Sequence, residues 1–223
     1  MTKKNTLSVL MFALIVLFLF NHGATAQSEL NIAKMSNYQK LSYRLKFIKN
    51  FKRLSMNTTL EDAKFLRIIV ECSHARRGIE VGSANGFGAI HLGMGFELNQ
   101  GKLITIEINP KMVRECRKNI KKMGLKNTVT CIKGDALQVL PKLKGTFDFI
   151  FLDANKPDYY KYFKAIEPKL SKGAVIVADN VIRGAALMKD FLDTMENNPN
   201  YDMVSFRASD EKKDGMAVIF KIK

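Results

Sequence analysis

The regular alternation of short apolar runs with amphipathic stretches is the feature that most constrains this fold. A chain of 223 residues has room for one domain with a sizeable core. Alternating strands and helices predict an α/β domain, in which helices cover both faces of a mostly parallel sheet. The strands predicted from the apolar runs are Gly78–Val81, Leu103–Ile108, Val129–Ile132, Phe147–Leu152, Ala174–Ala178, Met203–Phe206 and Met216–Ile222.

The N-terminus has the composition of an export signal. Lys3 and Lys4 precede an uncharged run from Leu7 to Phe20, and Ala24-Thr25-Ala26 offers small residues at the spacing that a signal peptidase cleaves. Residues 1–26 are therefore predicted to be a signal peptide, and the protein to be exported to the periplasm or secreted. The alternative is an uncleaved membrane anchor formed by residues 7–20, although this run is shorter than the roughly 20 residues that a span needs.

Residues 27–55 are predicted to form a basic amphipathic helical segment ahead of the main domain, residues 56–223. The stretch between Asn31 and Leu60 contains lysines and arginines but no acid, while Tyr38, Leu41 and Leu45 recur at helical spacing. Such a helix can contact an anionic membrane or nucleic acid. An ordinary solvated helix, with its apolar stripe on the domain, is the favoured interpretation.

The first predicted strand runs into a turn rich in glycine. Its spacing is G-x-x-x-G-x-G, which differs from the G-x-G-x-x-G of a dinucleotide fold. A tight glycine turn lets a ligand approach the backbone at a helix N-terminus, and a neighbouring acid adds a carboxylate. The candidate binding residues here are Glu80, Gly82, Ser83, Gly86 and Gly88.

Acids also end the second and third predicted strands. Glu107 stands at the tip of the second strand, where a carboxylate can accept both hydroxyls of a ribose. Asp135 stands at the tip of the third. Ligands bind at the carboxyl ends of parallel strands, so these acids and the glycine turn together predict a nucleoside ligand.

The fourth and fifth predicted strands end in oxygen-bearing side chains, Asp153 on the fourth and Asp179 with Asn180 on the fifth. Two carboxylates and an amide are hard ligands that suit Mg²⁺, and also Ca²⁺ or Mn²⁺. An isolated aspartate at a strand end is more often the N-cap of the following helix. For three such residues at adjacent strand ends, a divalent cation site is the favoured prediction.

Several of these motifs resemble those of the cation-dependent class I O-methyltransferases, the family of catechol and caffeoyl-CoA O-methyltransferases. The similarity runs from about Met56 to the C-terminus, in the order of the family. The motifs are E-x-G-x-x-x-G from Glu80, IEINP around Glu107, GDA at Asp135, FDFIFLDANKPDYYKYF at residues 147–163 and GAVIVADNVIRG at residues 173–184.

The resemblance implies a Rossmann-like class I methyltransferase fold, whose seven-stranded, mostly parallel sheet has an antiparallel last strand. It also implies S-adenosylmethionine (SAM) as methyl donor. By resemblance the glycine turn holds the methionine part, Glu107 the ribose, and Asp135 with Ala136 the adenine side. Asp153 is assigned to the donor site and also, with Asp179 and Asn180, to the metal site.

Lys156 matches the general base of the family, whereas Tyr159 and Tyr162 on the same helix are interpreted as packing residues. The predicted activity is methyl transfer to a hydroxyl of a small catechol-like or hydroxycinnamoyl-like acceptor, by a homodimer as in many relatives. Two alternatives stay open at this point. One is an RNA methyltransferase of the same fold, suggested by the basic helix and by the net charge, which is +15 for the full chain and +13 without Lys3 and Lys4 of the predicted signal peptide. The other is a non-catalytic nucleoside-binding or metal-binding module.

Overall fold

The computed structural model describes residues 32–54, 57–207, 210–211 and 213–223. The predicted signal peptide and the alternative anchor at residues 7–20 lie outside these ranges. The chain divides into two units, one ending at Leu45 and one spanning Lys46–Lys223. No helix within the described ranges is long and apolar enough to cross a membrane.

The described part of the first unit holds the short 3₁₀ helix η1 (Ile32–Lys34) and most of helix α2 (Asn37–Lys49), which continues into the second unit. A reciprocal pair of hydrogen bonds starts α2: Ser36 N donates to Gln39 Oε1 at 2.9 Å, and Gln39 N donates to Ser36 Oγ at 3.2 Å. This arrangement satisfies two backbone donors at the helix start. The helix lies within the segment predicted to be helical, residues 27–55.

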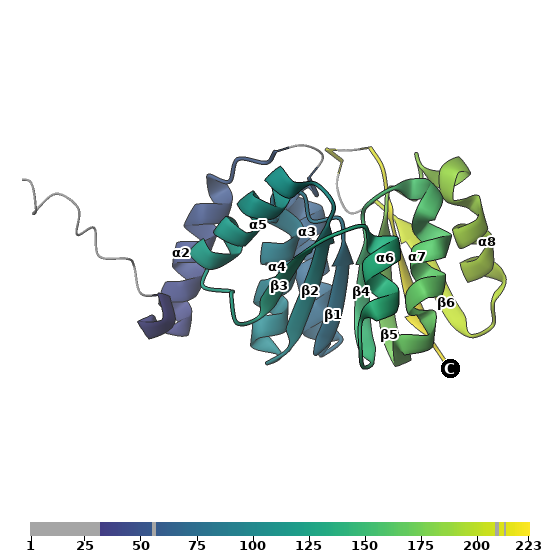
Figure 1. Ribbon diagram of the computed structural model, residues 1–223, viewed down its shortest axis with the longest axis horizontal. Helices are drawn as coiled ribbons and strands as arrows, with labels where there is room; N and C mark the ends of the chain where they lie inside the picture. Colours follow the sequence, from purple (N-terminus) through teal and green to yellow (C-terminus); the bar gives the residue numbers. More distant parts are fainter. Residues whose placement is uncertain (1–31, 55–56, 208–209, 212) are drawn as a thin grey trace, which may run out of the picture. The chain divides into compact units, whose positions relative to one another are not determined.

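The second unit is built on a seven-stranded sheet in the order β3-β2-β1-β4-β5-β7-β6 (Figure 1). The five strands from β3 to β5 pair in parallel, whereas β7 is antiparallel to both of its neighbours. This confirms the predicted sheet with its antiparallel last strand. The strands are β1 (Arg77–Val81), β2 (Lys102–Glu107), β3 (Val129–Lys133), β4 (Phe147–Leu152), β5 (Leu170–Asp179), β6 (Tyr201–Phe206) and β7 (Met216–Lys221).

Helices cover both faces of the sheet, as predicted. Ile150 of β4 belongs to a buried cluster with Phe163 and Phe191, while its neighbour Phe149 faces the other way and stacks edge-on against Phe96. Burying each such side chain contributes roughly 1.5–3 kcal/mol to stability. The helices are α3 (Leu60–Cys72), α4 (Phe87–Leu98), α5 (Pro110–Lys122), α6 (Ala136–Val139), α7 (Tyr159–Ile166) and α8 (Lys189–Asn197), with 3₁₀ turns η2 (Leu140–Lys142), η3 (Lys156–Asp158), η4 (Glu167–Lys169) and η5 (Ala185–Met188).

Strand β5 begins earlier than predicted, at Leu170 rather than Ala174. The added segment, Leu170–Gly173, contains two polar residues and a glycine whose φ of +79° is unusual in a strand. The apolar pattern therefore does not reveal the start of β5. The pairing with β4 also shifts register between Phe147 and Phe149. The extra residues lie at the end of the sheet away from the predicted ligand site.

Neighbouring strands β1 and β4 mark the point where the chain order in the sheet reverses. Gly82 follows β1 with a φ of +93°, and a Cβ atom there would lie 2.1 Å from the backbone oxygen of Asp153. Only glycine allows the two backbone segments, after β1 and after β4, to approach so closely. In open α/β sheets this reversal point is where ligands bind.

Candidate active site

A cavity of about 410 Å³ lies at the carboxyl ends of β1, β2, β3 and β4. The residues that line it include five predicted to bind the donor, which are Gly82, Glu107, Asp135, Ala136 and Asp153. Asp135 also caps α6, because its Oδ1 accepts the N–H of Leu137 at 2.9 Å. The structure therefore brings these predicted residues together around one space of suitable size for a small ligand.

Glu107 connects the two turns that border this cavity. Its Oε2 accepts the N–H of Ala84 at 2.8 Å, and its Oε1 accepts the N–H of Asn109 at 2.8 Å. Each carboxylate oxygen has two acceptor positions, so one on each oxygen remains for a ligand hydroxyl. Asn109 in turn caps α5 through hydrogen bonds from Lys111 N and Met112 N.

The other predicted residues of the glycine turn, Glu80, Ser83, Gly86 and Gly88, are not among the described residues that line this cavity. Glu80 is buried, and Thr105 Oγ1 donates a hydrogen bond to its Oε2 at 2.5 Å. A Cβ atom on Gly88 would lie 2.6 Å from Glu80 Oε1, so Gly88 leaves room for this carboxyl group. Burial raises the pKa of Glu80 from 4.5 to about 8. Glu80 thus lies in the interior of the domain, beside Thr105 and Gly88, and not in the cavity wall.

A second cavity, of about 750 Å³, also borders the segment that follows β4. It shares Asp153, Ala154 and Asn155 with the first cavity. Its remaining lining residues are Asn57, Lys156, Pro157, Asn180 and Leu187. Two cavities that share one wall can hold two ligands side by side, with reacting atoms near Asp153.

The predicted metal ligands lie at adjacent strand ends beside this second cavity. Asp153 directly follows β4 and Asp179 ends β5, and these strands pair in parallel, with Leu152 opposite Ala178. The Asp179 side chain is only 1% exposed, whereas Asn180 is partly exposed and lines the cavity. An all-oxygen set of two carboxylates and an amide fits a hard divalent cation.

The amide of Asn180 is the third member of this predicted set. Among the described residues, no three His, Cys, Asp or Glu side chains cluster in the manner of a metal site. A cation held at these strand ends by three protein ligands would therefore use the Asn180 amide beside two acids. The Asn180 backbone has a left-handed φ of 64°, a conformation that asparagine adopts more readily than most residues.

Lys156, the predicted base, lies three residues beyond Asp153 in η3. Its Nζ donates to Asp153 Oδ1 at 3.1 Å and to Tyr159 Oη at 2.9 Å. Tyr159 Oη lies 2.9 Å from the carbonyl oxygen of Leu152 and 3.2 Å from that of Asp179, and donates to this pair. Burial raises the pKa of Tyr159 well above 10, so its hydroxyl keeps its proton.

Tyr159 therefore does more than the packing role that its sequence position suggested. The ring is buried in the core, as expected, but the hydroxyl joins the ends of β4 and β5 and holds Lys156. Tyr162, the second tyrosine interpreted as packing, is buried too and lines the first cavity. A hydroxyl three residues after a candidate base, one helical turn away, is the signal that could have revealed this role.

Asp214 is a buried acid of the site that strand-end reasoning missed. It is 7% exposed and immediately precedes Gly215 and β7. Its Oδ2 accepts from Asn180 Nδ2 at 3.1 Å, and its Oδ1 accepts the N–H groups of Ile182, Arg183 and Gly215. Burial alone would raise the pKa of Asp214, but these hydrogen bonds lower it overall, so the group is an ionised acceptor.

Comparison with known proteins shows the family. Residues 33–211 match the O-methyltransferase family, and the chain belongs to it. The catechol O-methyltransferase of Mycobacterium tuberculosis is 37% identical over 131 residues, which cover 58% of this chain and 59% of that protein. The catechol O-methyltransferase of Niastella koreensis is 34% identical over 140 residues, covering 61% of this chain and 63% of that protein. The matched part thus spans about three fifths of the length of these curated relatives.

Solved structures give the same result. Cofactor-bound Rv0187 from MTB superimposes with a TM-score of 0.71 at 29% identity, covering 82% of this chain and 89% of that chain. The O-methyltransferase TomG from Streptomyces achromogenes, in complex with SAM, has a TM-score of 0.71 at 25% identity, covering 88% and 94%. These likenesses confirm the predicted Rossmann-like methyltransferase fold.

Proposed function

We propose that this protein is a SAM-dependent O-methyltransferase that requires a divalent cation and acts on a small hydroxylated acceptor. The observation that supports this most strongly is the pair of cavities that share Asp153, Ala154 and Asn155. Donor and acceptor held in these two spaces would meet at one segment. Holding two reactants in a productive geometry supplies roughly 7–11 kcal/mol of barrier reduction.

The smaller cavity is the proposed donor site. Gly82 has no side chain to obstruct its close approach to Asp153 there. Each carboxylate oxygen of Glu107 accepts one backbone N–H and can accept a second hydrogen bond, from a ribose hydroxyl. Asp135 and Ala136 line the part of the wall proposed for the adenine. The structures of TomG in complex with SAM and of cofactor-bound Rv0187 support a nucleoside cofactor in this fold.

Asp153, Asp179 and Asn180 are the proposed ligands of the cation, with Mg²⁺ favoured and Ca²⁺ or Mn²⁺ as alternatives. A divalent cation bound to an acceptor hydroxyl stabilises its ionised form and so makes the oxygen a better nucleophile. The acceptor class follows from the relatives, which include catechol and caffeoyl-CoA O-methyltransferases. We therefore propose a catechol-like or hydroxycinnamoyl-like acceptor.

Lys156 is the proposed acceptor of the hydroxyl proton. Its Nζ is held 3.1 Å from Asp153 Oδ1 and 2.9 Å from Tyr159 Oη and lines the second cavity, and the lone pair of a lysine amine can take up the incoming proton. In the transfer itself, the acceptor oxygen forms a bond to the methyl carbon while the carbon–sulfur bond of SAM breaks. S-adenosylhomocysteine (SAH) leaves, and the proton resides on Lys156.

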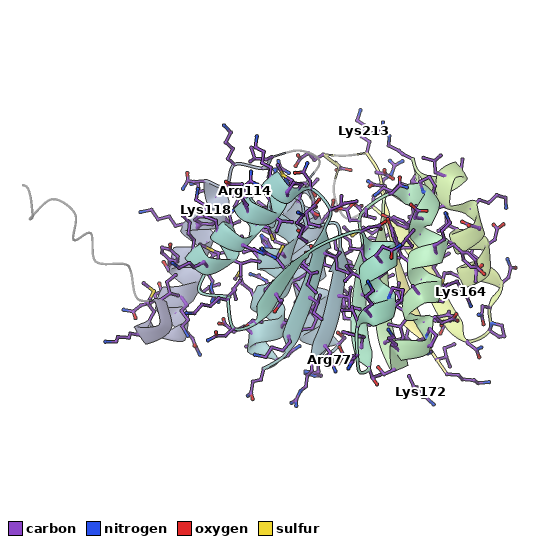
Figure 2. All side chains as sticks on the ribbon, in the orientation of Figure 1. Arg77, Arg114, Lys118, Lys164, Lys172 and Lys213 are labelled. Carbon is purple, nitrogen blue, oxygen red and sulfur yellow. The ribbon has the colours of Figure 1, made fainter. Side chains whose placement is uncertain are left out.

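A small molecule suits this surface better than nucleic acid does. Figure 2 labels six exposed basic side chains of the second unit. Arg114 and Lys118 lie one turn apart on α5, whereas the other four lie on other elements, away from α5: Arg77, Lys164, Lys172 and Lys213. A nucleic-acid site would gather such charges along one face. Export through residues 1–26, or anchoring by residues 7–20, and assembly as a homodimer are further proposals that rest on the sequence and the resemblance.

Incubation with methyl-labelled SAM and Mg²⁺ tests the proposal. The acceptors are a panel of catechols and hydroxycinnamoyl esters, each paired with an analogue that lacks one of its vicinal hydroxyls. We expect label in at least one vicinal diol and much less in its matched analogue, since only the diol can chelate a cation. SAM binding without transfer to any member of the panel would contradict the proposed activity.

A further inference from the structure

Asp214 occupies a position from which it controls the orientation of a proposed metal ligand. Strand β7 is antiparallel, so its start lies at the same edge of the sheet as the ends of β4 and β5, and Met216 pairs with Asp179. Gly215 O accepts the N–H of Val181 at 3.0 Å, which fixes the two segments against each other. The carboxylate of Asp214 is thereby buried directly beside Asn180.

The hydrogen bonds of Asp214 determine which end of the Asn180 amide faces it. Asn180 Nδ2 donates to Asp214 Oδ2 at 3.1 Å, so the NH₂ end of the amide faces Asp214. The carbonyl Oδ1 of the amide consequently points away from Asp214. In the described part of the chain no donor is bonded to that oxygen, and Asn180 lines the second cavity.

The backbone around Asn180 is held as firmly as the side chain. Asn180 N donates to Asp179 Oδ1 at 2.8 Å, and its carbonyl oxygen accepts from Gly184 N at 2.8 Å. Asp214 Oδ1 fixes the next turn through the N–H groups of Ile182 at 3.1 Å and Arg183 at 2.9 Å. Rotation about the side-chain bonds of Asn180 is the freedom that remains, and the hydrogen bond to Asp214 Oδ2 restricts it.

We infer that Asp214 is a positioning residue, which presents the Asn180 carbonyl oxygen to a divalent cation. This inference rests on the proposed role of Asn180 as a metal ligand. An amide turned the other way would direct N–H groups at the cation, and these cannot bind it. Partners that orient metal ligands in this manner typically affect metal affinity by roughly 10–100-fold.

The variant Asp214→Asn tests the inference with little change of shape. The introduced amide keeps a carbonyl oxygen for the three backbone N–H groups, but its NH₂ end replaces Oδ2 and opposes the NH₂ of Asn180. The Asn180 amide is then expected to turn over. The double variant Asp214→Asn with Asn180→Asp reverses the polarity of the pair, because the new carboxylate accepts from the new amide and retains an oxygen for the cation.

The readout is binding of Mn²⁺ alone to the full chain, measured by electron paramagnetic resonance, beside SAH binding measured by calorimetry. We expect Asp214→Asn to weaken Mn²⁺ binding about tenfold or more, with SAH affinity unchanged, and the double variant to recover most of the loss. Asp202→Asn removes the same charge from an exposed position of β6 and should bind Mn²⁺ as the wild type does.

The outcomes distinguish a failure of the inference from a failure of the function on which it rests. A wild-type chain that does not bind Mn²⁺ overturns the proposed metal site and the inference together. Wild-type binding that is unchanged in Asp214→Asn overturns the inference and leaves the proposed function standing. If the single variant does not fold, the folded double variant decides: Mn²⁺ affinity near that of the wild type supports the inference, and its loss refutes it.

Discussion

The buried carboxyl group of Glu80 predicts an unusual pH dependence of stability. Folded protein holds the proton of this group up to about pH 8, whereas the unfolded chain releases it near pH 4.5. Between these values the folded state binds more protons, so the free energy of unfolding falls as the pH rises. The contribution of Glu80 is fully present below pH 4.5 and is lost as the pH passes through about 8.

The size of the effect follows from the two pKa values. Each pH unit between 4.5 and about 8 corresponds to about 1.4 kcal/mol, so the loss is bounded at roughly 5 kcal/mol. In Glu80→Gln the side chain has no proton to release, and this slope disappears. The variant should therefore be less sensitive than the wild type to a rise from about pH 5 to about pH 8.

Urea denaturation followed by circular dichroism, without SAM, measures both proteins across this pH range. Buried His91 gives the opposite slope, because burial lowers its pKa from 6.5 to about 3, but His91 is common to both proteins and cancels in their difference. Glu61→Gln, an exposed position at the start of α3, is the matched control and should follow the wild type. Parallel curves for Glu80→Gln and the wild type would refute the reasoning.

Three further substitutions test other parts of the site. Glu107→Ala should weaken SAM binding measured by calorimetry, because each lost charge-assisted hydrogen bond is worth roughly 1.5–3 kcal/mol; unchanged affinity would exclude Glu107 from the donor site. Tyr159→Phe should lower kcat about fivefold, since Lys156 loses a hydrogen bond worth about 1 kcal/mol, while SAH affinity stays constant. An unaltered kcat would mean that the hydroxyl only packs. Gly82→Ala should lower the free energy of unfolding, measured in urea, by about 2–4 kcal/mol, because of the positive φ at this position and the clash of the new Cβ with Asp153 O. Unchanged stability would show that the segments at Gly82 and Asp153 can move apart without cost.

Much of the sheet and of the proposed donor site could be predicted from the sequence. Apolar runs such as Phe147–Leu152 identify buried strands, and the carboxyl ends of parallel strands share one edge. Glu107, Asp135 and Asp153 could therefore be placed around one ligand before any coordinates were known. The glycine turn was identified as well. Of its residues, Gly82 lines the cavity, whereas Glu80 is buried inside the domain.

The supporting residues could not be predicted in the same way. Asp214 precedes a strand instead of following one, and only the antiparallel direction of β7 brings it to the ligand edge. Tyr159 lies in an apolar helical pattern, so its buried ring hides the role of its hydroxyl. Both roles depend on distances between segments far apart in the chain, which periodicity and motif spacing do not record.

The metal dependence of methyl transfer tests the central claim most directly. The measurement is the rate of label transfer from SAM to the best vicinal diol, first in chelator and then with Mg²⁺ restored, for the wild type and for Asp179→Ala, with SAH calorimetry as the control for folding. We predict that chelation abolishes the wild-type rate, that Mg²⁺ restores it, and that Asp179→Ala binds SAH yet stays inactive. Full activity of the wild type in chelator, or Mg²⁺-dependent activity of Asp179→Ala equal to that of the wild type, would contradict the account.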